Sequence, residues 1–383
     1  MVPEGWDDAT LGDLVKLQRG HDLPSQNRID GEVKVIGGGG PNGFHNVARA
    51  NAPGIVIGRS GSGIGNAWWS VEDFWPLNTG MYVTDYLGND PRFCFLWLDW
   101  IDFTSHNSGG AQPSLNRNFI YPIPLPIPPL PEQRKIADIL STWDQAIEKT
   151  EALLANARTQ KRALMQQLLT GKRRFPAFEG QPWKEVRLGD VGIVSSAGVD
   201  KKSESGQPDV RLLNFLDVFR REFIFDQELD HVVSAPPAKV EKCNVRCGDI
   251  FFTPSSETRK DIAISAVAAE DMLGVCYSYH VVRFRLTEPW DLNFRAYVFQ
   301  NDDFRKQAYK LGDGGGQRYV ISQGNFRNMV VRVPSVAEQQ QIGRILRAAS
   351  EEVTELERQI IKLRTEKKAL MQQLLTGKRR VVV

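Results

Sequence analysis

Cysteine is scarce in this 383-residue sequence, and the positions of its four cysteines suggest no framework of disulfides. Cys94 stands alone and the others fall in the second half, which excludes the dense cross-linking of a small secreted scaffold. The spacing of Cys243 and Cys247 matches half of a zinc site. No second pair of Cys or His follows at a suitable distance, so we expect no metal.

Long hydrophobic runs are absent as well. No stretch approaches the roughly eighteen uncharged apolar residues of a membrane span. The first residues, MVPEGWDDATLGD, have neither the basic start nor the apolar run of a secretory leader. We therefore expect a cytoplasmic protein, and its 383 residues exceed one ordinary core, so that two domains are expected.

Motifs of the common catalytic sites are missing too. The segment GSGIGN at 61–66 lacks the glycine spacing of a dinucleotide-binding fingerprint, and no phosphate-binding loop occurs. The sequence contains no Asn/Asp-Pro-Pro-aromatic motif of an amino-methyltransferase. The five histidines are dispersed, and none has a Ser or Cys partner at a diagnostic spacing. We therefore predict that the chain is not itself an enzyme.

Charge of one sign is not in large excess either, because the net charge is only +2. Residues 1–130 carry a net charge of −5 and residues 175–337 a net charge of −1. Residues 131–174 and 338–383 each carry +4, so the basic excess lies in two separate segments. A chain that bound nucleic acid by bulk attraction alone would be more basic. Binding would therefore need locally arranged contacts or basic partners.

Those two basic segments are copies of each other. The twelve residues ALMQQLLTGKRR stand at 163–174 and again at 369–380. Alignment of residues 132–174 with residues 338–380 needs no gap and gives 21 identities in 43 positions. An internal repeat of this kind has to be explained before any other feature of the fold.

Both copies have the periodicity of a long helix. Apolar residues recur at alternating steps of three and four over about five heptads, which is the stripe of a coiled coil. Each helix of about 39 residues extends about 58 Å at about 1.5 Å per residue. We predict that the helices pair with each other, because a helix of that length overhangs a single domain. Lys161 and Lys367 are polar positions within the stripe. The predicted interface residues are Ile136, Leu140, Ile147, Leu154, Leu164, Leu168, Ile342, Leu346, Val353, Ile360, Leu370 and Leu374.

The helix ends are marked in the sequence. Pro131 and Glu132 suit a first turn, and the Ser335-x-x-Glu338 pattern predicts a capping box. Gly171 and Gly377 supply the glycine at which each helix stops. In an antiparallel pair the two copies of the repeat lie at opposite ends. We expect the carboxyl end of the chain to return near the first domain.

A fainter repeat opens each globular segment. The pattern W-x-x-x-x-L-G-D begins at Trp6 and again at Trp183, and both segments then show short strand-like runs and a few helical ones. The predicted class is α+β, with two dissimilar globules and two similar helices. We divide the chain into a first domain (1–130), a central helix (131–174), a second domain (175–335) and a C-terminal helix (336–383).

The pattern P-L-P-E-Q-x-x-I-A-x-I-L, then a long helix, then L-M-Q-Q-L-L-T-G-K-x-R, resembles the specificity subunits of type I restriction–modification systems. The resemblance covers the whole chain, including the loops QPSL and QRYVIS. It implies two target recognition domains, each reading one half of a bipartite asymmetric DNA site. It implies an antiparallel, pseudo-two-fold coiled coil that sets the gap between half-sites. It also implies two modification subunits that use S-adenosylmethionine to methylate adenine, and restriction/motor subunits that use ATP and Mg.

We expect the DNA contacts in glycine-rich polar loops, where the backbone can approach a groove closely. In the first domain the candidates are Gly39, Asn42, His45, Arg59, Ser60, Asn78, Gln112 and Asn116. In the second domain they are Arg211, Asn214, Ser255, Arg259, Lys260, Gln317, Arg318 and Ser322.

Three alternatives remain open at this stage. The chain would serve a modification-only methyltransferase complex if no restriction subunit accompanies it. A scaffold whose domains bind protein would cause no sequence-dependent binding of duplex DNA. A self-sufficient nuclease or methyltransferase would show metal- or S-adenosylmethionine-dependent activity by itself, which the missing motifs disfavour.

Overall fold

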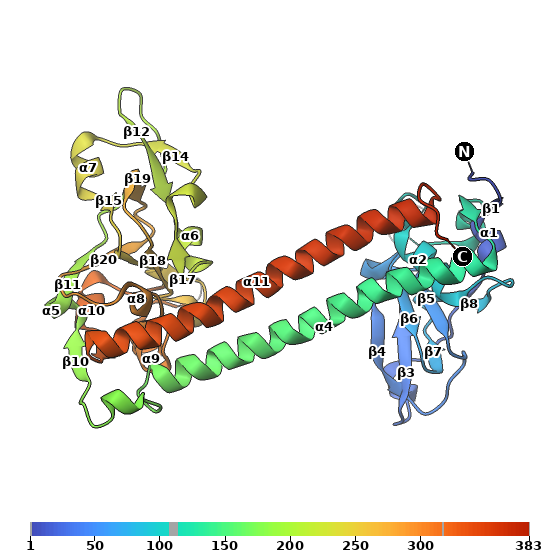
Figure 1. Ribbon diagram of the computed structural model, residues 1–383, viewed down its shortest axis with the longest axis horizontal. Coiled ribbons are helices and arrows are strands. Elements are labelled where there is room, and N and C mark those ends of the chain that lie inside the picture. Colours follow the sequence, from blue (N-terminus) through green and yellow to red (C-terminus); the bar gives the residue numbers. More distant parts are fainter. Residues whose placement is uncertain (1, 107–113, 316–317, 383) are drawn as a thin grey trace. The chain divides into compact units, whose positions relative to one another are not determined.

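Two long helices dominate the secondary structure of the protein (Figure 1). The computed structural model describes residues 2–106, 114–315 and 318–382. Helix α4 spans Leu130–Leu168 with 39 residues, and helix α11 spans Val336–Leu375 with 40, so the predicted helix lengths are confirmed. None of the helices within these ranges combines the length and the apolar composition that crossing a bilayer requires.

The chain folds into two compact units, each of which takes part of both long helices. Unit 1 consists of Met1–Ala152 and Arg358–Val383, and unit 2 consists of Leu153–Glu357. Each unit mixes helices with sheets, and the predicted α+β class is confirmed.

Unit 1 contains a four-stranded antiparallel sheet in the order β2-β8-β5-β6 and a three-stranded sheet in the order β4-β3-β7. Strands β3 and β7 run parallel, and the short pair β1 and β9 is antiparallel. The strands are β1 (Asp7–Thr10), β2 (Lys16–Arg19), β3 (Val33–Gly37), β4 (Gly40–His45), β5 (Gly54–Gly58), β6 (Ala67–Ser70), β7 (Phe74–Pro76), β8 (Gly80–Asp85) and β9 (Pro124–Ile127). The short helices are α1 (Leu11–Leu14), α2 (Pro91–Trp100) and α3 (Arg117–Ile120).

The main core of unit 1 joins its largest sheet to helix α2 and to the long helices. Apolar side chains of β5 and α2, such as Ile55 and Leu96, are fully buried in it. Ile136 of α4 and Leu374 of α11 belong to the same cluster, at 1% and 2% exposure. Because α4 begins where α11 ends in this core, the two helix segments of unit 1 run antiparallel.

Unit 2 contains a five-stranded sheet in the order β11-β20-β16-β18-β13, a four-stranded sheet in the order β14-β12-β19-β15, and the pairs β10-β22 and β17-β21. The strands are β10 (Lys184–Arg187), β11 (Gly192–Ser195), β12 (Asp209–Leu213), β13 (Phe223–Ile224), β14 (Val232–Ser234), β15 (Asn244–Val245), β16 (Ile250–Phe252), β17 (Ser255–Ser256), β18 (Ser265–Ala268), β19 (Met272–Tyr277), β20 (Val282–Leu286), β21 (Tyr319–Val320) and β22 (Val330–Val333). The short helices are α5 (Leu188–Val191), α6 (Phe215–Phe219), α7 (Pro237–Lys242), α8 (Leu292–Val298), α9 (Asp302–Leu311) and α10 (Gln323–Asn328).

The largest core of unit 2 lies between the five-stranded sheet and the helices α8, α9 and α10. Aromatic rings fill it, with Phe252 of β16 in contact with Phe299, Phe304 and Phe326 at centroid distances of 5.1, 6.0 and 5.4 Å. Leu168 of α4 and the first turns of α11 are part of this cluster. A separate core fills the four-stranded sheet. Unit 2 thus repeats the arrangement of unit 1, in which the ends of both long helices enter the globular core.

The W-x-x-x-x-L-G-D openings have the same structure in both units. A strand is followed by a one-turn helix and a second strand, as β1–α1–β2 and as β10–α5–β11. The leucine that begins each one-turn helix, Leu11 or Leu188, is fully buried. The first strand of each opening pairs antiparallel with the strand that leads into a long helix, β1 with β9 and β10 with β22. The fainter repeat therefore encodes the attachment of each domain to its helix.

Candidate nucleic-acid interface

In unit 2 the first turn of α11 is held by the end of the first repeat. The carboxylate of Glu338, at 1% exposure, accepts hydrogen bonds from Arg174 at 2.6 and 2.9 Å and from Trp183 Nε1 at 3.2 Å. The bond to Glu338 raises the pKa of the Arg174 guanidinium. The predicted capping box is therefore half right: Ser335 Oγ accepts from the Glu338 amide at 3.5 Å, but the carboxylate turns to the arginine. A guanidinium offers the carboxylate two parallel N–H···O bonds and a full positive charge, whereas a main-chain amide offers one bond.

Unit 1 contains the same arrangement, made by the end of the second repeat. Glu132 accepts from Arg380 at 2.5 and 3.0 Å and from Trp6 Nε1 at 3.2 Å. Arg380 also donates to Glu4 O at 2.7 Å, and a Cβ on Gly377 would lie 2.2 Å from the Pro3 ring. The predicted return of the carboxyl end to the first domain is confirmed. The glycine at this position has φ of +68°, as a helix stop requires.

The glutamine after each of these glutamates binds the domain as well. Gln133 accepts from the Asp90 amide at 2.8 Å, and Gln339 accepts from the Asp291 amide at 3.0 Å. Each glutamine also donates to the carbonyl of a preceding proline, and each aspartate caps the helix that follows it, α2 or α8. The Glu-Gln dipeptide of the repeat is thus a common attachment for two otherwise dissimilar domains.

Identical residues also link the two helices. In unit 1, Glu151 of α4 pairs with Arg364 of α11 at 2.6 Å. In unit 2, Arg158 of α4 pairs with Glu357 of α11 at 2.6 Å. These are the same Glu and Arg of the repeat, exchanged between helices. The exchange shows that the helix segments are antiparallel within each unit.

The lysines within the predicted stripe each have an acidic partner. In unit 1, Lys367 binds Asp144 of α4 at 2.5 Å. In unit 2, Lys161 binds Glu222 of the globular domain at 2.5 Å, and Ser350 of α11 donates to the same carboxylate at 2.7 Å. The helix position that holds Asp144 in one copy holds Ser350 in the other, 206 residues later. The domain therefore supplies the missing carboxylate in unit 2.

The twelve predicted interface residues are all at least half-buried, and many of them pack into a domain core. The buried ones are Ile136, Leu140, Leu154, Leu168, Ile342, Leu346, Ile360 and Leu374, and the half-buried ones are Ile147, Leu164, Val353 and Leu370. Near its ends the stripe packs against globular cores in addition to the other helix.

In unit 1 several of the predicted DNA residues lie in loops that meet. The amides of Arg59 and Ser60 donate to Thr79 O at 2.8 and 3.2 Å, and the Leu115 amide donates to Arg59 O at 2.8 Å. The Gly38 amide donates to Thr79 Oγ1 at 3.1 Å. These bonds bring together the segments that carry Gly39, Arg59, Ser60, Asn78 and Asn116.

Glycine is required where these loops meet. A Cβ on Gly58 would lie 1.7 Å from Gly63 O, and one on Gly63 would lie 2.1 Å from Gly38 O. No side chain fits at such distances, so the glycines allow three loops to touch. The exposed Gly39 has open space around it, which suits close approach by a ligand backbone.

The other first-domain candidates are placed differently. His45 is 6% exposed, accepts from the Ile29 amide at 3.1 Å and packs edge-on against Trp75, with ring centroids 5.1 Å apart. Its surroundings give it a structural role in the core. Asn42 is exposed on β4, and Arg28 donates to its carbonyl. Gln112 lies outside the described residues.

Unit 2 contains one large cavity of about 1100 Å³, which we call the loop cavity, and two of the predicted residues, Ser255 and Arg318, line it. Arg318 donates to Ser255 Oγ at 3.0 Å, and strands β17 and β21 join their two loops. Arg259 lies over the Tyr319 ring at 4.8 Å, and Ser322 caps α10. The loop cavity is lined by Lys201, Phe215, Phe219, Ser255, Ser256, Glu257, Thr258, Asp261, His280 and Arg318.

The remaining second-domain candidates lie apart from this cavity lining. Arg211 binds both carboxylate oxygens of Asp226 at 2.8 and 2.9 Å and the Leu273 carbonyl at 3.2 Å. Its guanidinium is already engaged within the domain. Asn214 precedes α6, and its main-chain amide donates to the Asp217 carboxylate at 2.8 Å. Lys260 is exposed in the loop beside Arg259, and Gln317 lies outside the described residues.

Sequence reasoning predicted only Ser255 and Arg318 in the lining of the loop cavity, and the residues that it missed include two phenylalanines, a lysine and a histidine. Phe215 and Phe219 are one helical turn apart on α6 and stack at a centroid distance of 5.7 Å and an angle of 16°. Their spacing in the sequence was the available signal. Lys201 and His280 come from distant loops, and only folding brings them to the lining. Burial, together with the charges of Lys201 and Arg318, lowers the pKa of His280. The lining thus combines aromatic rings and cations with the carboxylates of Glu257 and Asp261.

The cysteines remain separate thiols, and the described residues contain no cluster of three His, Cys, Asp or Glu side chains arranged to hold a metal ion. Cys94, Cys243 and Cys276 are buried, whereas Cys247 is exposed. Burial raises the pKa of Cys276 to about 11.

Comparison with known proteins identifies relatives of this chain. The family model described as the type I restriction modification DNA specificity domain matches residues 3–156 and residues 180–363. The type I restriction enzyme MjaVIII specificity subunit of Methanocaldococcus jannaschii is 25% identical over 99% of this chain and 94% of its own.

Solved structures show the same fold. The S subunit of a type I restriction–modification system from M. genitalium matches 98% of this chain and 99% of its own, with a TM-score of 0.64 and 15% identity. A chain from a study of complex assembly and conformational transition in the type I R-M system covers 99% of this chain and 100% of its own, with a TM-score of 0.59 and 16% identity. With two family domains attached to its helices by the same contacts, the chain belongs to the family of type I restriction–modification specificity subunits.

Proposed function

We propose that this chain recognises a bipartite DNA site for a type I restriction–modification complex and is itself non-catalytic. The observation that carries the proposal is that two dissimilar domains are attached to two copies of one helical repeat by the same Glu, Gln, Arg and Trp contacts. Identical attachments with different globules support the assignment of sequence specificity to the globules. Each domain would then read one half-site, and the two half-sites would differ.

The helices suit the role of a spacer. A helix of 39 residues extends about 58 Å at about 1.5 Å per residue, whereas duplex DNA presents the same face about every 34–36 Å. Helices paired by Glu–Arg bridges and a buried apolar stripe are stiff, as a glycine-rich linker is not. The proposal therefore assigns the length of the gap between half-sites to α4 and α11.

The repeat also contains identical residues that the fold does not use. Gln166 and Gln167 near the end of α4 are exposed, as are their counterparts Gln372 and Gln373 in α11. Within the described residues, these four glutamines form hydrogen bonds only through their main chain. Identity without an internal contact favours an external one. We infer that each end of the helix pair presents this surface to one of two identical modification subunits.

The proposal assigns the cofactors to the partners. S-adenosylmethionine would belong to the modification subunits, and ATP and Mg to restriction/motor subunits that join the complex. A cytoplasmic location, where chromosomal DNA is accessible, is part of the proposal.

The test is to co-express the chain with the modification protein encoded beside it and to map methylated adenines across the host genome. The expected result is one bipartite motif with a fixed gap. Scattered or absent methylation would contradict the proposal. Added restriction of unmodified phage DNA would separate a complete restriction system from a modification-only complex.

The docking surface has its own test. Gln167→Arg and Gln373→Arg, each alone, should reduce the bound modification subunits from two to one in native mass spectrometry, and together should abolish binding. Gln145→Arg is the matched control, because Gln145 is exposed on α4 and its counterpart, Glu351, is a different residue. An unchanged stoichiometry in the double variant would refute this surface.

A further inference from the structure

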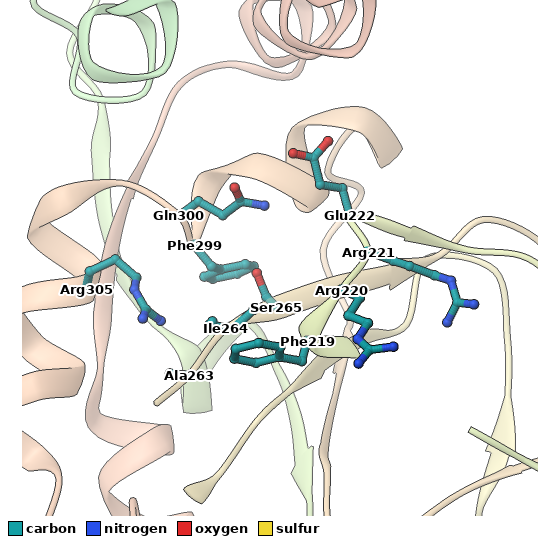
Figure 2. A pocket seen from close by; sticks show the side chains of 10 residues that line it. All are labelled: Phe219, Arg220, Arg221, Glu222, Ala263, Ile264, Ser265, Phe299, Gln300 and Arg305. Carbon is teal, nitrogen blue, oxygen red and sulfur yellow. The ribbon is translucent and has the colours of Figure 1, made fainter. Parts of the chain in front are cut away.

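A second cavity of about 370 Å³ lies in unit 2, beside the loop cavity (Figure 2). Its wall is formed by the segment that ends α6, by the start of β18 and by the turn between α8 and α9. We call it the arginine cavity, because three arginines line it. The lining includes Phe219, Arg220, Arg221, Glu222, Ser265 and Arg305.

The charges around this cavity do not cancel. Arg221 is neutralised by Asp217 at 2.6 Å, with Glu228 at 3.3 Å, and Figure 2 shows it turned away from the cavity. The one glutamate of the lining, Glu222, is bound by Lys161. The other two arginines, Arg220 and Arg305, have no carboxylate partner among the residues that the structure describes. The cavity therefore carries two uncompensated positive charges.

The two free charges are Arg220 and Arg305. Arg220 is exposed at the end of α6. Arg305 points toward the cavity from α9, and its guanidinium donates to the main-chain carbonyls of Lys260 and Ile262. Carbonyl oxygens orient a guanidinium without neutralising it. Arg305 is thereby fixed in place as a cation at the edge of the 253–260 loop, which carries predicted DNA contacts.

A buried hydroxyl in the same lining lacks a partner. Ser265, the first residue of β18, is 1% exposed, and its Oγ has no hydrogen-bond partner among the described residues. A buried polar group left in this state destabilises the fold, and such groups are rare in folded proteins. An acceptor atom in the cavity would satisfy it. A hydroxyl and two guanidinium groups are all donors, which suits a ligand made of acceptors.

The backbone beside Ser265 is held in an unusual conformation. Ala263 has φ of +57°, in the left-handed region that a non-glycine residue adopts at a cost. Thr253 fixes it, because its carbonyl accepts from the Ala263 amide at 2.8 Å and its hydroxyl accepts from the Ile264 amide at 3.0 Å. The strained turn sets where β18, and with it Ser265, begins.

The opposite wall is anchored to the long helices. Glu222 accepts from Lys161 of α4 at 2.5 Å and from Ser350 of α11 at 2.7 Å. A ligand in the arginine cavity would therefore be held at a fixed place relative to the helix segments of unit 2. In unit 1 a cavity of similar volume, about 360 Å³, has carboxylates in its lining, Asp99 and Asp102.

We propose that the arginine cavity binds one backbone phosphate of the DNA that the second domain reads. A phosphate offers only acceptor oxygens and a negative charge, which match Ser265, Arg220 and Arg305. Phe219 lines both this cavity and the loop cavity, so the phosphate lies next to the predicted base contacts. Phosphate contacts fix the register of a protein on DNA, and the anchored wall gives this one a defined position. The inference rests on the proposed function.

The experiment uses the full chain in complex with its modification partner and duplexes that carry the mapped site. Each phosphate around the second half-site is replaced in turn by a neutral methylphosphonate. In the wild type, one position should reduce affinity about tenfold. In the double variant Arg220→Gln/Ser265→Ala, affinity for the duplex that keeps all its natural phosphates should fall by a similar factor. Replacement of the same phosphate by methylphosphonate should then cause no further loss of affinity, as a double-mutant cycle requires. The slope of log K against log salt should fall by about 1.

Arg246→Gln is the matched control, because this arginine is exposed in the same unit and is not part of either cavity lining. It should leave the methylphosphonate profile unchanged. Suppose that the variant complex still binds its site and that every methylphosphonate reduces its affinity as much as it does in the wild type. The phosphate proposal is then refuted and the proposed function stands. If the wild-type complex shows no site-specific binding, the proposed function itself fails.

A second arm distinguishes a free anion from DNA. Inorganic phosphate and deoxyadenosine monophosphate are titrated against the full chain by calorimetry. One outcome would overturn the DNA assignment. The chain would bind one of these compounds saturably, in a way that depends on Ser265 and Arg220, while the variant kept the wild-type methylphosphonate profile. The cavity would then be assigned to a free phosphate compound.

Discussion

Removal of the Glu338 carboxylate should loosen the attachment of the second domain to α11. Glu338→Ala leaves Arg174 and Trp183 without their acceptor in a place where the carboxylate is 1% exposed and the arginine side chain 17% exposed. Removing one partner of a buried ion pair costs about 3–5 kcal/mol. We expect about 3 kcal/mol, the lower end, because Arg174 reaches solvent and can rehydrate.

The assay is hydrogen exchange of the amides that pair β10 with β22, directly beside Trp183. A loss of about 3 kcal/mol in local opening free energy corresponds to exchange about 100-fold faster, at tenfold per 1.4 kcal/mol. Glu357→Ala is the control, since its bridge to Arg158 joins side chains that are 44% and 57% exposed, and exposed pairs contribute less than about 1 kcal/mol.

The equivalent change in unit 1 completes the comparison. Glu132→Ala should accelerate exchange in the β1–β9 pair, but by less, because the Arg380 side chain is 42% exposed. Equal exchange rates in Glu338→Ala and wild type would refute the conclusion that this carboxylate holds the domain. If Glu357→Ala accelerates exchange as much as Glu338→Ala does, the conclusion that the buried ion pair contributes more than the exposed one is wrong.

Three further outcomes are expected. A double-mutant cycle of Lys161→Met and Glu222→Gln, measured by denaturant unfolding, should give a coupling energy of about 1–3 kcal/mol, because both side chains are less than a quarter exposed. A coupling energy near zero would contradict an energetic link between the two residues. Iodoacetamide should modify only Cys247 in the native chain, because the other three cysteines are buried. The rate should still rise above pH 9, because partial loss of solvation and the charge of Asp271 raise the pKa of this thiol. Cys247→Ser should abolish the reaction, and native labelling of another cysteine would contradict the described burial. Insertion of one heptad into both long helices should lengthen the gap of the methylated motif by about three base pairs, since seven residues add about 10 Å. Both half-sites should stay unchanged, and an altered half-site would contradict the assignment of sequence specificity to the globular domains.

Local sequence patterns were sufficient for the scaffold. The stripe from Ile136 to Leu168 and its copy from Ile342 to Leu374 predicted both long helices, because apolar side chains at alternating steps of three and four fall on one helix face. Glycine at 171 and 377 predicted the helix stops, and both adopt positive φ. The short strand-like runs in the globular segments predicted the mixed class, and two of them, VKVIGG and GIVIGRS, contain β3 and β5.

The roles of individual charged residues depended on contacts between distant segments. Glu338 matched a local capping pattern, yet its carboxylate binds an arginine 164 residues away. Arg211 matched a base-reading residue by type, but Asp226 engages its guanidinium. His45 matched a loop ligand, but its ring is buried against Trp75. The chemistry of a side chain limits which partners it is able to bind, and tertiary packing determines which of these partners lies close enough.

The sequence alone thus determined the repeat, the two long helices, the α+β class and the family resemblance, because these depend on periodicity and on matching residues along the chain. Only the tertiary structure decided that the repeated Glu and Gln attach dissimilar domains in the same way, and that Phe219, Ser265 and Arg305 line one cavity. Those residues are separated by tens of positions in the chain. Their proximity follows from strand order and core packing, which no local pattern encodes.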